Sequence, residues 1–73
     1  MNEALAREQA RLGEHLLELR RRSGLSQESA AELAGVHEKY LSKLERGRAN
    51  PTLSTLMALA AAYRAPLATL FAR

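Results

Sequence analysis

The chain has 73 residues, of which 11 are Lys or Arg and 8 are Asp or Glu, so its formal net charge is +3. This length allows one small domain, and the positive balance is compatible with nucleic-acid binding without establishing it. Because no cysteine is present, disulfides and thiolate metal sites are excluded. The sequence has neither a signal-peptide pattern nor an apolar run that could span a membrane, so we expect a soluble, cytoplasmic protein.

The first predicted element is a long helix from about residue 2 to residue 23. Leu5, Leu12, Leu16 and Leu19 recur along it at helical spacing. Gly13 weakens this pattern, so residues 1–11 are interpreted as a helical leader or extension and residues 12–73 as the domain. The leader is either a solvated end, as chain termini commonly are, or an arm that adds a dimer contact.

Two short helices joined by a tight turn are predicted in the middle of the chain. Ser26 can cap the first helix with its hydroxyl, and Gly35 stands where a helix end commonly needs a left-handed residue. The second helix covers about residues 38–46, and Leu41 and Leu44 lie on its inner side. A helix with one apolar and one polar side can pack on a core and still present polar groups to a partner.

Two further helices follow a loop that contains Asn50 and Pro51. Thr52 can cap a helix that extends to about residue 64. One face of this helix carries Leu53, Leu56, Leu59, Ala60 and Tyr63. A last short helix covers residues 67–72. With no strand pattern, repeat or low-complexity tract, the predicted fold class is an all-α, compact domain of five helices.

Several residues of the central region stand in register with one another: Gln27, Ala31, Gly35, Leu41, Leu44 and Glu45-Arg46-Gly47. This set resembles the helix-turn-helix of the lambda-repressor/Cro, or XRE, family. The resemblance extends from about residue 12 to residue 71. The further combination Ala-Gly-Val-His-x-x-Tyr-x-Ser, which starts at Ala34, is similar to small controller proteins of restriction–modification systems. The resemblance implies a DNA-binding regulator of transcription.

Four positions depart from the family pattern. Ala30 stands where leucine is common, and Pro66 stands where a capping serine is frequent. His37 stands where serine or threonine usually caps the recognition helix, and Arg64 stands where glycine is frequent. These departures concern helix ends rather than the fold.

The resemblance places the positions of Glu38, Lys39 and Lys43 at base edges in the major groove. Lysine can donate to guanine O6 and N7, and glutamate can accept from cytosine N4. For Glu38 the alternative is favourable interaction with the helix dipole, and for the lysines it is a solvated charged face.

Candidates for phosphate contacts surround these positions. Gln27 heads the first motif helix and could also brace the recognition helix, while Tyr40 could pack its ring on the core and keep its hydroxyl wet. The phosphate-contact candidates are Gln27, Tyr40, Ser42, Arg46, Arg48 and Asn50. The resemblance also pairs Arg20 with Glu45 as a partly buried structural ion pair.

The resemblance further implies a homodimer that binds a palindromic operator in double-stranded DNA, with half-sites roughly 34 Å apart. The predicted interface comprises four late apolar side chains, unless these close the core of the monomer instead: Tyr63, Leu67, Leu70 and Phe71.

No constellation suggests catalysis. His15 and His37 lack metal-ligand spacing, and no nucleophile–base pair or phosphate-binding glycine loop is present, so we expect no enzyme activity, metal, cofactor or small-molecule ligand. Two alternatives to a transcriptional regulator remain. One is an antitoxin-type protein-interaction module, for which residues 1–11 could serve, and the other is an inert helical bundle.

Overall fold

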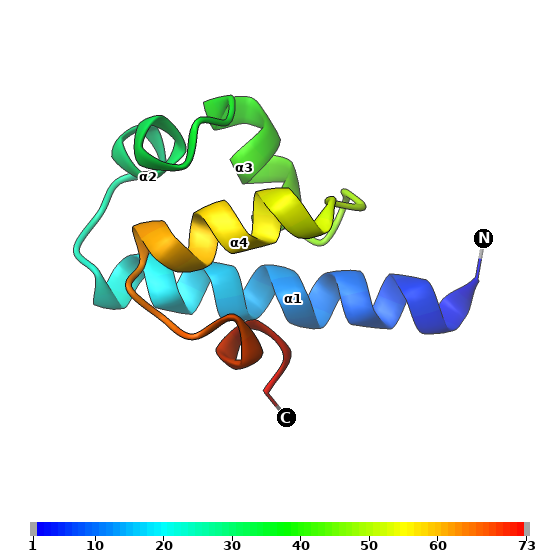
Figure 1. Ribbon diagram of the computed structural model, residues 1–73. Helices are drawn as coiled ribbons and strands as arrows, with labels where there is room; N and C mark the ends of the chain where they lie inside the picture. The colour runs from blue at the N-terminus through cyan, green and yellow to red at the C-terminus, as the bar shows by residue number, and fades with distance from the viewer. Residues whose placement is uncertain (1, 73) are drawn as a thin grey trace.

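A computed structural model describes residues 2–72, which form five helical elements and no strand. These are α1 (Glu3–Arg22), α2 (Gln27–Ala34), α3 (Glu38–Glu45), α4 (Leu53–Ala62) and the 3-10 helix η1 (Leu67–Phe71). Figure 1 shows α2 and α3 above α1, with α4 in front and η1 below. The predicted all-α class is confirmed. The last predicted helix is a 3-10 helix, as is common for a segment this short.

α1 runs without interruption through Gly13, the residue expected to weaken it. Gly13 is buried where α1 crosses the end of α3. A Cβ built on it would lie 2.5 Å from the carbonyl oxygen of Leu44 and 2.7 Å from that of Glu45. The glycine therefore lowers helix propensity but lets two backbones approach closely. Because α1 is continuous from Glu3 to Arg22, no break in the backbone corresponds to the predicted boundary between residues 11 and 12.

Side chains cap three of the four α-helices at their N-termini. The hydroxyl of Ser26 accepts from the Ser29 amide at 3.0 Å, and that of Thr52 accepts from the Thr55 amide at 3.2 Å. These are the two caps predicted from the sequence. His37 occupies the same position before α3 and makes no such bond. The start of α3 therefore depends on tertiary packing rather than on a local cap.

All four α-helices end with the same backbone motif. A residue with positive φ follows the helix, and the next amide donates to a carbonyl five residues earlier. The residues with positive φ are Gly24, Gly35, Gly47 and Arg64. Arg64 has φ 54°, a conformation that costs a residue with a Cβ about 1 kcal/mol. The sequence departure noted at Arg64 is thus a strained helix end.

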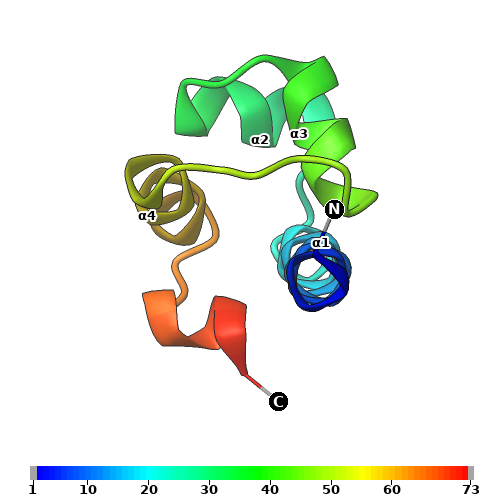
Figure 2. The ribbon, with the colours of Figure 1, turned by 90° about the vertical axis from the view of Figure 1, so that its right-hand side faces the viewer.

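Leucines from four of the five elements fill the core, and each contributes roughly 2 kcal/mol by burial. The fully buried ones are Leu16, Leu41, Leu44, Leu59 and Leu70. α2 supplies small residues instead, since its buried side chains are Ala30 and Ala31. Small side chains on α2 allow it to pack closely against α3 and α4. Figure 2 shows α2 beside α3 and above α4.

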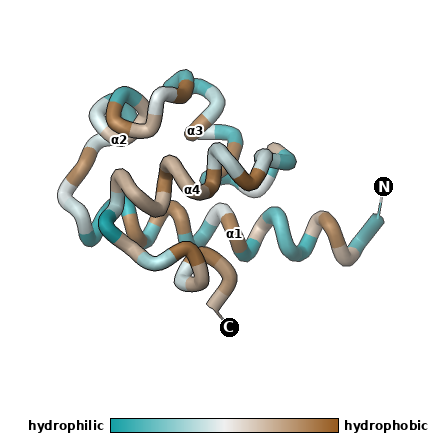
Figure 3. The backbone as a smooth tube through the Cα atoms, in the orientation of Figure 1, coloured by the Kyte–Doolittle hydropathy of each residue, from teal (hydrophilic) through white to brown (hydrophobic). Residues whose placement is uncertain are grey.

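The outer side of α4 is apolar as well as its inner side. Its sequence, LSTLMALAAA, carries no charge, and Figure 3 shows it in white and brown tones where α1 alternates between teal and brown. Leu53 and Met57 are 61% and 55% exposed. An uncharged surface helix of this kind is unusual, because charged and polar side chains normally cover the solvent-facing side of such a helix.

The predicted dimer interface needs correction. Tyr63 and Leu70 are buried within their own chain, so they close the monomer core, which was the alternative interpretation. η1 is held against α1 by a contact of 2.8 Å between His15 Nδ1 and the carbonyl oxygen of Leu70. Of the four predicted interface residues, Leu67 is half-buried and Phe71 remains 48% exposed.

Candidate nucleic-acid interface

α3 is amphipathic, with its apolar side on the core and its polar side toward solvent, as a groove-binding helix requires. Leu41 and Leu44 are buried on its inner side, whereas Lys39 and Lys43 are exposed. Figure 1 places α3 at the edge of the molecule opposite α1's outer side and η1. No described segment of the chain covers the lysines. The polar side of α3 is therefore free to meet a partner.

The charge on this side is mostly positive. Four cations are exposed on α3 and just after it: Lys39, Lys43, Arg46 and Arg48. The one exposed carboxylate within residues 38–48 is Glu38. Clustered cations attract polyanions, and the attraction weakens as salt screens it. Asn50, also exposed, extends the same polar strip into the following loop.

A buried ion pair fixes the inner side of α3 to α1. Arg20 Nε lies 2.7 Å from Glu45 Oε2, and Arg20 Nη2 lies 3.2 Å from Glu45 Oε1. The side chains are only 15% and 4% exposed. The second amino group of Arg20 donates to the carbonyl oxygen of Leu25 at 2.9 Å. The hydrogen bond to Glu45 raises the pKa of Arg20, so the guanidinium stays charged.

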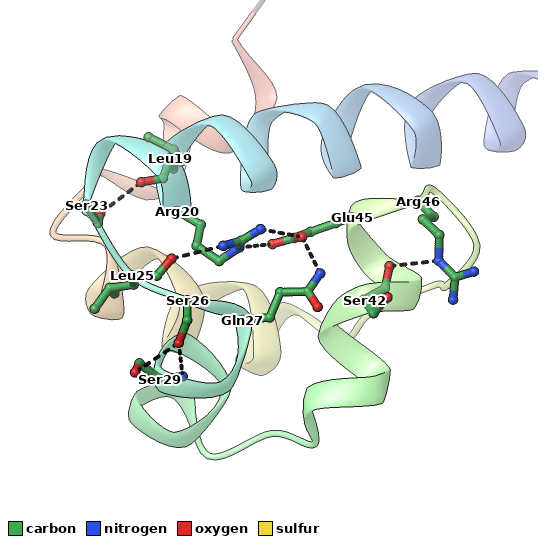
Figure 4. Close-up of polar contacts among 10 residues, drawn as sticks. All are labelled: Leu19, Arg20, Ser23, Leu25, Ser26, Gln27, Ser29, Ser42, Glu45 and Arg46. Carbon is green, nitrogen blue, oxygen red and sulfur yellow. Dashed lines mark hydrogen bonds and ion pairs between the residues drawn. The ribbon is translucent and has the colours of Figure 1, made fainter.

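Gln27 adds α2 to this cluster. Its Nε2 donates to Glu45 Oε1 at 2.8 Å, so Glu45 receives hydrogen bonds from both α1 and α2 (Figure 4). The side chain of Gln27 thus braces the end of α3. Its amide nitrogen carries a second hydrogen, which leaves one donor for another acceptor.

Tyr63 closes the cluster from the side of α4, a role that the sequence analysis missed. Its hydroxyl is buried and has no hydrogen-bond partner among the described residues. Burial, reinforced by the Glu45 carboxylate, raises the pKa of Tyr63 to about 12. The signal was present in the sequence, because Tyr63 shares a helical face with Leu56 and Leu59.

Residues 11–71 match the family described as "Helix-turn-helix domain". The chain belongs to this family. Control protein C.SmaI of Serratia marcescens is 40% identical to it over 62 residues, which cover 85% of this chain and 74% of C.SmaI. The chain is also similar to the uncharacterized HTH-type transcriptional regulator y4dJ of Sinorhizobium fredii (strain NBRC 101917 / NGR234), with 49% identity over 51 residues, 70% of this chain. It spans 66% of that relative's length, just under two thirds.

The fold agrees with a solved structure. The restriction-modification controller protein C.AhdI from Aeromonas hydrophila has a TM-score of 0.84 and 38% identity to this chain, over 86% of this chain and 96% of C.AhdI. The predicted lambda-repressor-like architecture is thereby confirmed, with α2 and α3 as the two helices of the helix-turn-helix.

The other predicted contact residues of this helix-turn-helix lie at different depths. Tyr40 is partly buried and packs against the core. Ser42 is partly buried, and its carbonyl oxygen accepts from Arg46 Nε at 3.3 Å. Arg46 itself is exposed and points away from the cluster of Arg20 and Glu45 in Figure 4. The structure therefore brings Arg46 and the exposed lysines to one accessible region, with Tyr40 and Ser42 at its edge.

Residues 2–72 lack two kinds of feature. No group of three His, Asp or Glu side chains there is arranged to hold a metal ion. Nor does any helix in this range combine the length and apolar character needed to cross a bilayer.

Proposed function

We propose that this protein is a sequence-specific transcriptional regulator that places α3 in the major groove of double-stranded DNA. The observation that carries the proposal is the two-sided character of α3: Lys39 and Lys43 face solvent while Leu41 and Leu44 anchor the helix. An α-helix with its side chains is about 10–12 Å across, so α3 fits a groove about 12 Å wide. The names of its relatives, which include transcriptional regulators, support the same function.

In this proposal Lys39 and Lys43 donate to guanine O6 and N7 or to flanking phosphates. Glu38 accepts from cytosine N4, or serves only to stabilise the start of α3. The phosphate contacts come from Gln27, Tyr40, Ser42, Arg46, Arg48 and Asn50. For Gln27 the contact uses the amide hydrogen that Glu45 leaves free.

We further propose that the protein binds a palindromic operator as a homodimer. One short helix reads only a few base pairs, and a two-fold dimer doubles the site. The large apolar side chains still exposed for such an interface are Leu5 of α1, Leu33 of α2, Leu53 and Met57 of α4 and Phe71 of η1. They take the place of Tyr63 and Leu70, which the monomer core uses.

The similarity to C.AhdI and C.SmaI supports a more specific role as the controller of a restriction–modification system. C.AhdI is nearly covered by the aligned region, so the two chains share almost their whole domain. A controller of this size would respond to its own concentration through dimerisation.

Selection of bound sequences from random duplex DNA tests the proposal. The wild type should yield a palindromic consensus, and Lys43→Ala should weaken or change the preference at symmetric positions of both half-sites. Arg22→Ala is the matched control. Arg22 is exposed and lies about 200° around α1 from Arg20, so it faces away from α3. Recovery of no consensus at low salt would contradict the proposed function.

A further inference from the structure

The N-terminal half of α1 packs against the turn that follows α3. Gly47 ends α3 with φ +72°, and a Cβ built on it would lie 2.8 Å from Ala10 Cα and 3.1 Å from Ala10 N. The turn is closed by the amide of Arg48, which donates to the carbonyl oxygen of Lys43 at 2.9 Å. Two backbones therefore meet here without an intervening side chain.

One side chain extends this contact beyond the turn. Gln9 Nε2 donates to the carbonyl oxygen of Ala49 at 3.0 Å, in a partly buried position. Ala49 also packs against the core, whereas its neighbours Arg48 and Asn50 are exposed. The backbone is thus held at Ala49, and the side chains on either side of it are directed outward.

We infer that Gln9 is a positioning residue for the phosphate contacts of Arg48 and Asn50, an inference that rests on the proposed function. Neither residue belongs to a helix, so no helical backbone holds these two side chains in place. A loop that is ordered before binding loses less conformational freedom when it meets DNA. α1 supplies that order through Gln9 and Ala10, which lie within residues 1–11, the segment that the sequence predicts to be a leader or extension.

Two sets of proposed DNA contacts are held in place by different parts of the chain. Lys39 and Lys43 are carried by α3, which the core leucines and Glu45 hold in place. Arg48 and Asn50 are carried by a loop that Gln9 holds in place. Loss of the Gln9 amide should therefore weaken the loop's contacts and leave those of α3 intact.

Gln9→Met is the variant of choice, because methionine keeps the length and helix propensity of glutamine and removes its donor. We expect a loss of duplex affinity of about fivefold at low salt, because binding must then order the loop side chains that the hydrogen bond holds in the wild type. In the Arg48→Ala background the same change should have a smaller effect on affinity, because only the contact of Asn50 then depends on Gln9. In the Lys43→Ala background it should keep its full effect, because those two sites are independent.

Amide hydrogen exchange in the free protein gives a second readout that does not involve DNA. Gln9→Met should accelerate exchange at Arg48, whose amide closes the turn on the Lys43 carbonyl oxygen, and leave the amides of α3 as slow as in the wild type. An affinity equal to the wild type's, or an undiminished loss in the Arg48→Ala background, would overturn the inference. Unchanged exchange at Arg48 would also overturn it.

The outcomes for the two proposals are distinguishable. If the wild type shows no salt-sensitive duplex affinity, the proposed function fails whatever Gln9→Met does. If the wild type binds and only the coupling between Gln9 and Arg48 is missing, the positioning role fails and the proposed function stands.

Discussion

Arg20 and Glu45 form a two-point ion pair across the α1–α3 contact, with Nε to Oε2 at 2.7 Å and Nη2 to Oε1 at 3.2 Å. Glu45 ends α3, where the helix dipole disfavours a negative charge. Its carboxylate is nearly inaccessible to water, so the guanidinium and the Gln27 amide replace the hydration it has lost. The orientation of α3 on the bundle therefore depends on this pair.

Glu45→Ala should destabilise the fold by about 3 kcal/mol, because it leaves Arg20 partly buried without its partner. Arg20→Ala should act in the same direction. Urea unfolding followed by circular dichroism measures the effect. A domain of this size has a total stability of roughly 5 kcal/mol, so the variant would be close to unfolding at room temperature.

Glu18→Ala is the matched control for this substitution. Glu18 pairs with Arg22 at 2.9 Å, but the two side chains are 54% and 74% exposed. An exposed pair of this kind contributes less than about 0.5 kcal/mol. Equal stability losses in Glu18→Ala and Glu45→Ala would show that burial of the inner pair has no energetic consequence.

Tyr63→Phe should stabilise the protein by about 1 kcal/mol at neutral pH, since it removes a buried hydroxyl that has no partner. The pKa of Tyr63 rises from an ordinary 10.0 to about 12 in the folded state, so the unfolded chain releases this proton first. Wild-type stability should accordingly fall as the pH increases from about 10 through 12.

The phenylalanine variant lacks this proton and should lose less stability over the same pH range. Unfolding curves of both proteins between pH 8 and about 12 make the comparison. Parallel losses in the two proteins would mean that other groups cause the alkaline decline.

Gly13→Ala should lower the stability of the protein, although helix propensity alone predicts an increase. Alanine in place of a mid-helix glycine ordinarily stabilises a helix by up to about 1 kcal/mol. Here the added Cβ would lie 2.5 Å and 2.7 Å from two carbonyl oxygens of α3, neither of which can move alone. We expect a net loss of about 2 kcal/mol, seen as a lower thermal midpoint. A raised midpoint would show that α1 and α3 can separate at little cost.

Arg64→Gly should stabilise the protein by about 1 kcal/mol, because glycine adopts the left-handed conformation after α4 without strain. For a domain of this length the thermal midpoint should increase by about 5 °C. Arg64→Ala removes the same charge but keeps the Cβ, so its midpoint should not increase. If both variants gained equally, the charge rather than the backbone would be responsible.

The local features of this fold could be predicted from the sequence. The Ser26 and Thr52 caps and the turn at Gly35 depend on residues three or four apart, whose geometry the helix itself dictates. The inward leucines of α3 follow from helical periodicity in the same way.

The features that were missed depend on contacts between distant segments. Gly13 looks like a weak point until α3 is placed against it, and the bond from Gln9 to Ala49 joins residues 40 apart. Tyr63 shares a face with the core leucines, yet only the packed bundle shows that it is buried and has no outer surface to offer a partner. Periodicity identifies which side of a helix is apolar but not what covers it.

The salt dependence of duplex affinity tests most directly whether α3 is the DNA-binding helix. The measurement uses a selected operator duplex and compares the wild type with a Lys39→Ala/Lys43→Ala double variant and the Arg22→Ala control. We predict that wild-type affinity falls steeply with salt and that the double variant, which removes two cations from the outer side of α3, binds more weakly and with a smaller log–log slope, while Arg22→Ala leaves both unchanged. A wild-type affinity that is flat with salt, or an equal loss of slope in Arg22→Ala, would contradict the assignment of α3 as the DNA-binding helix.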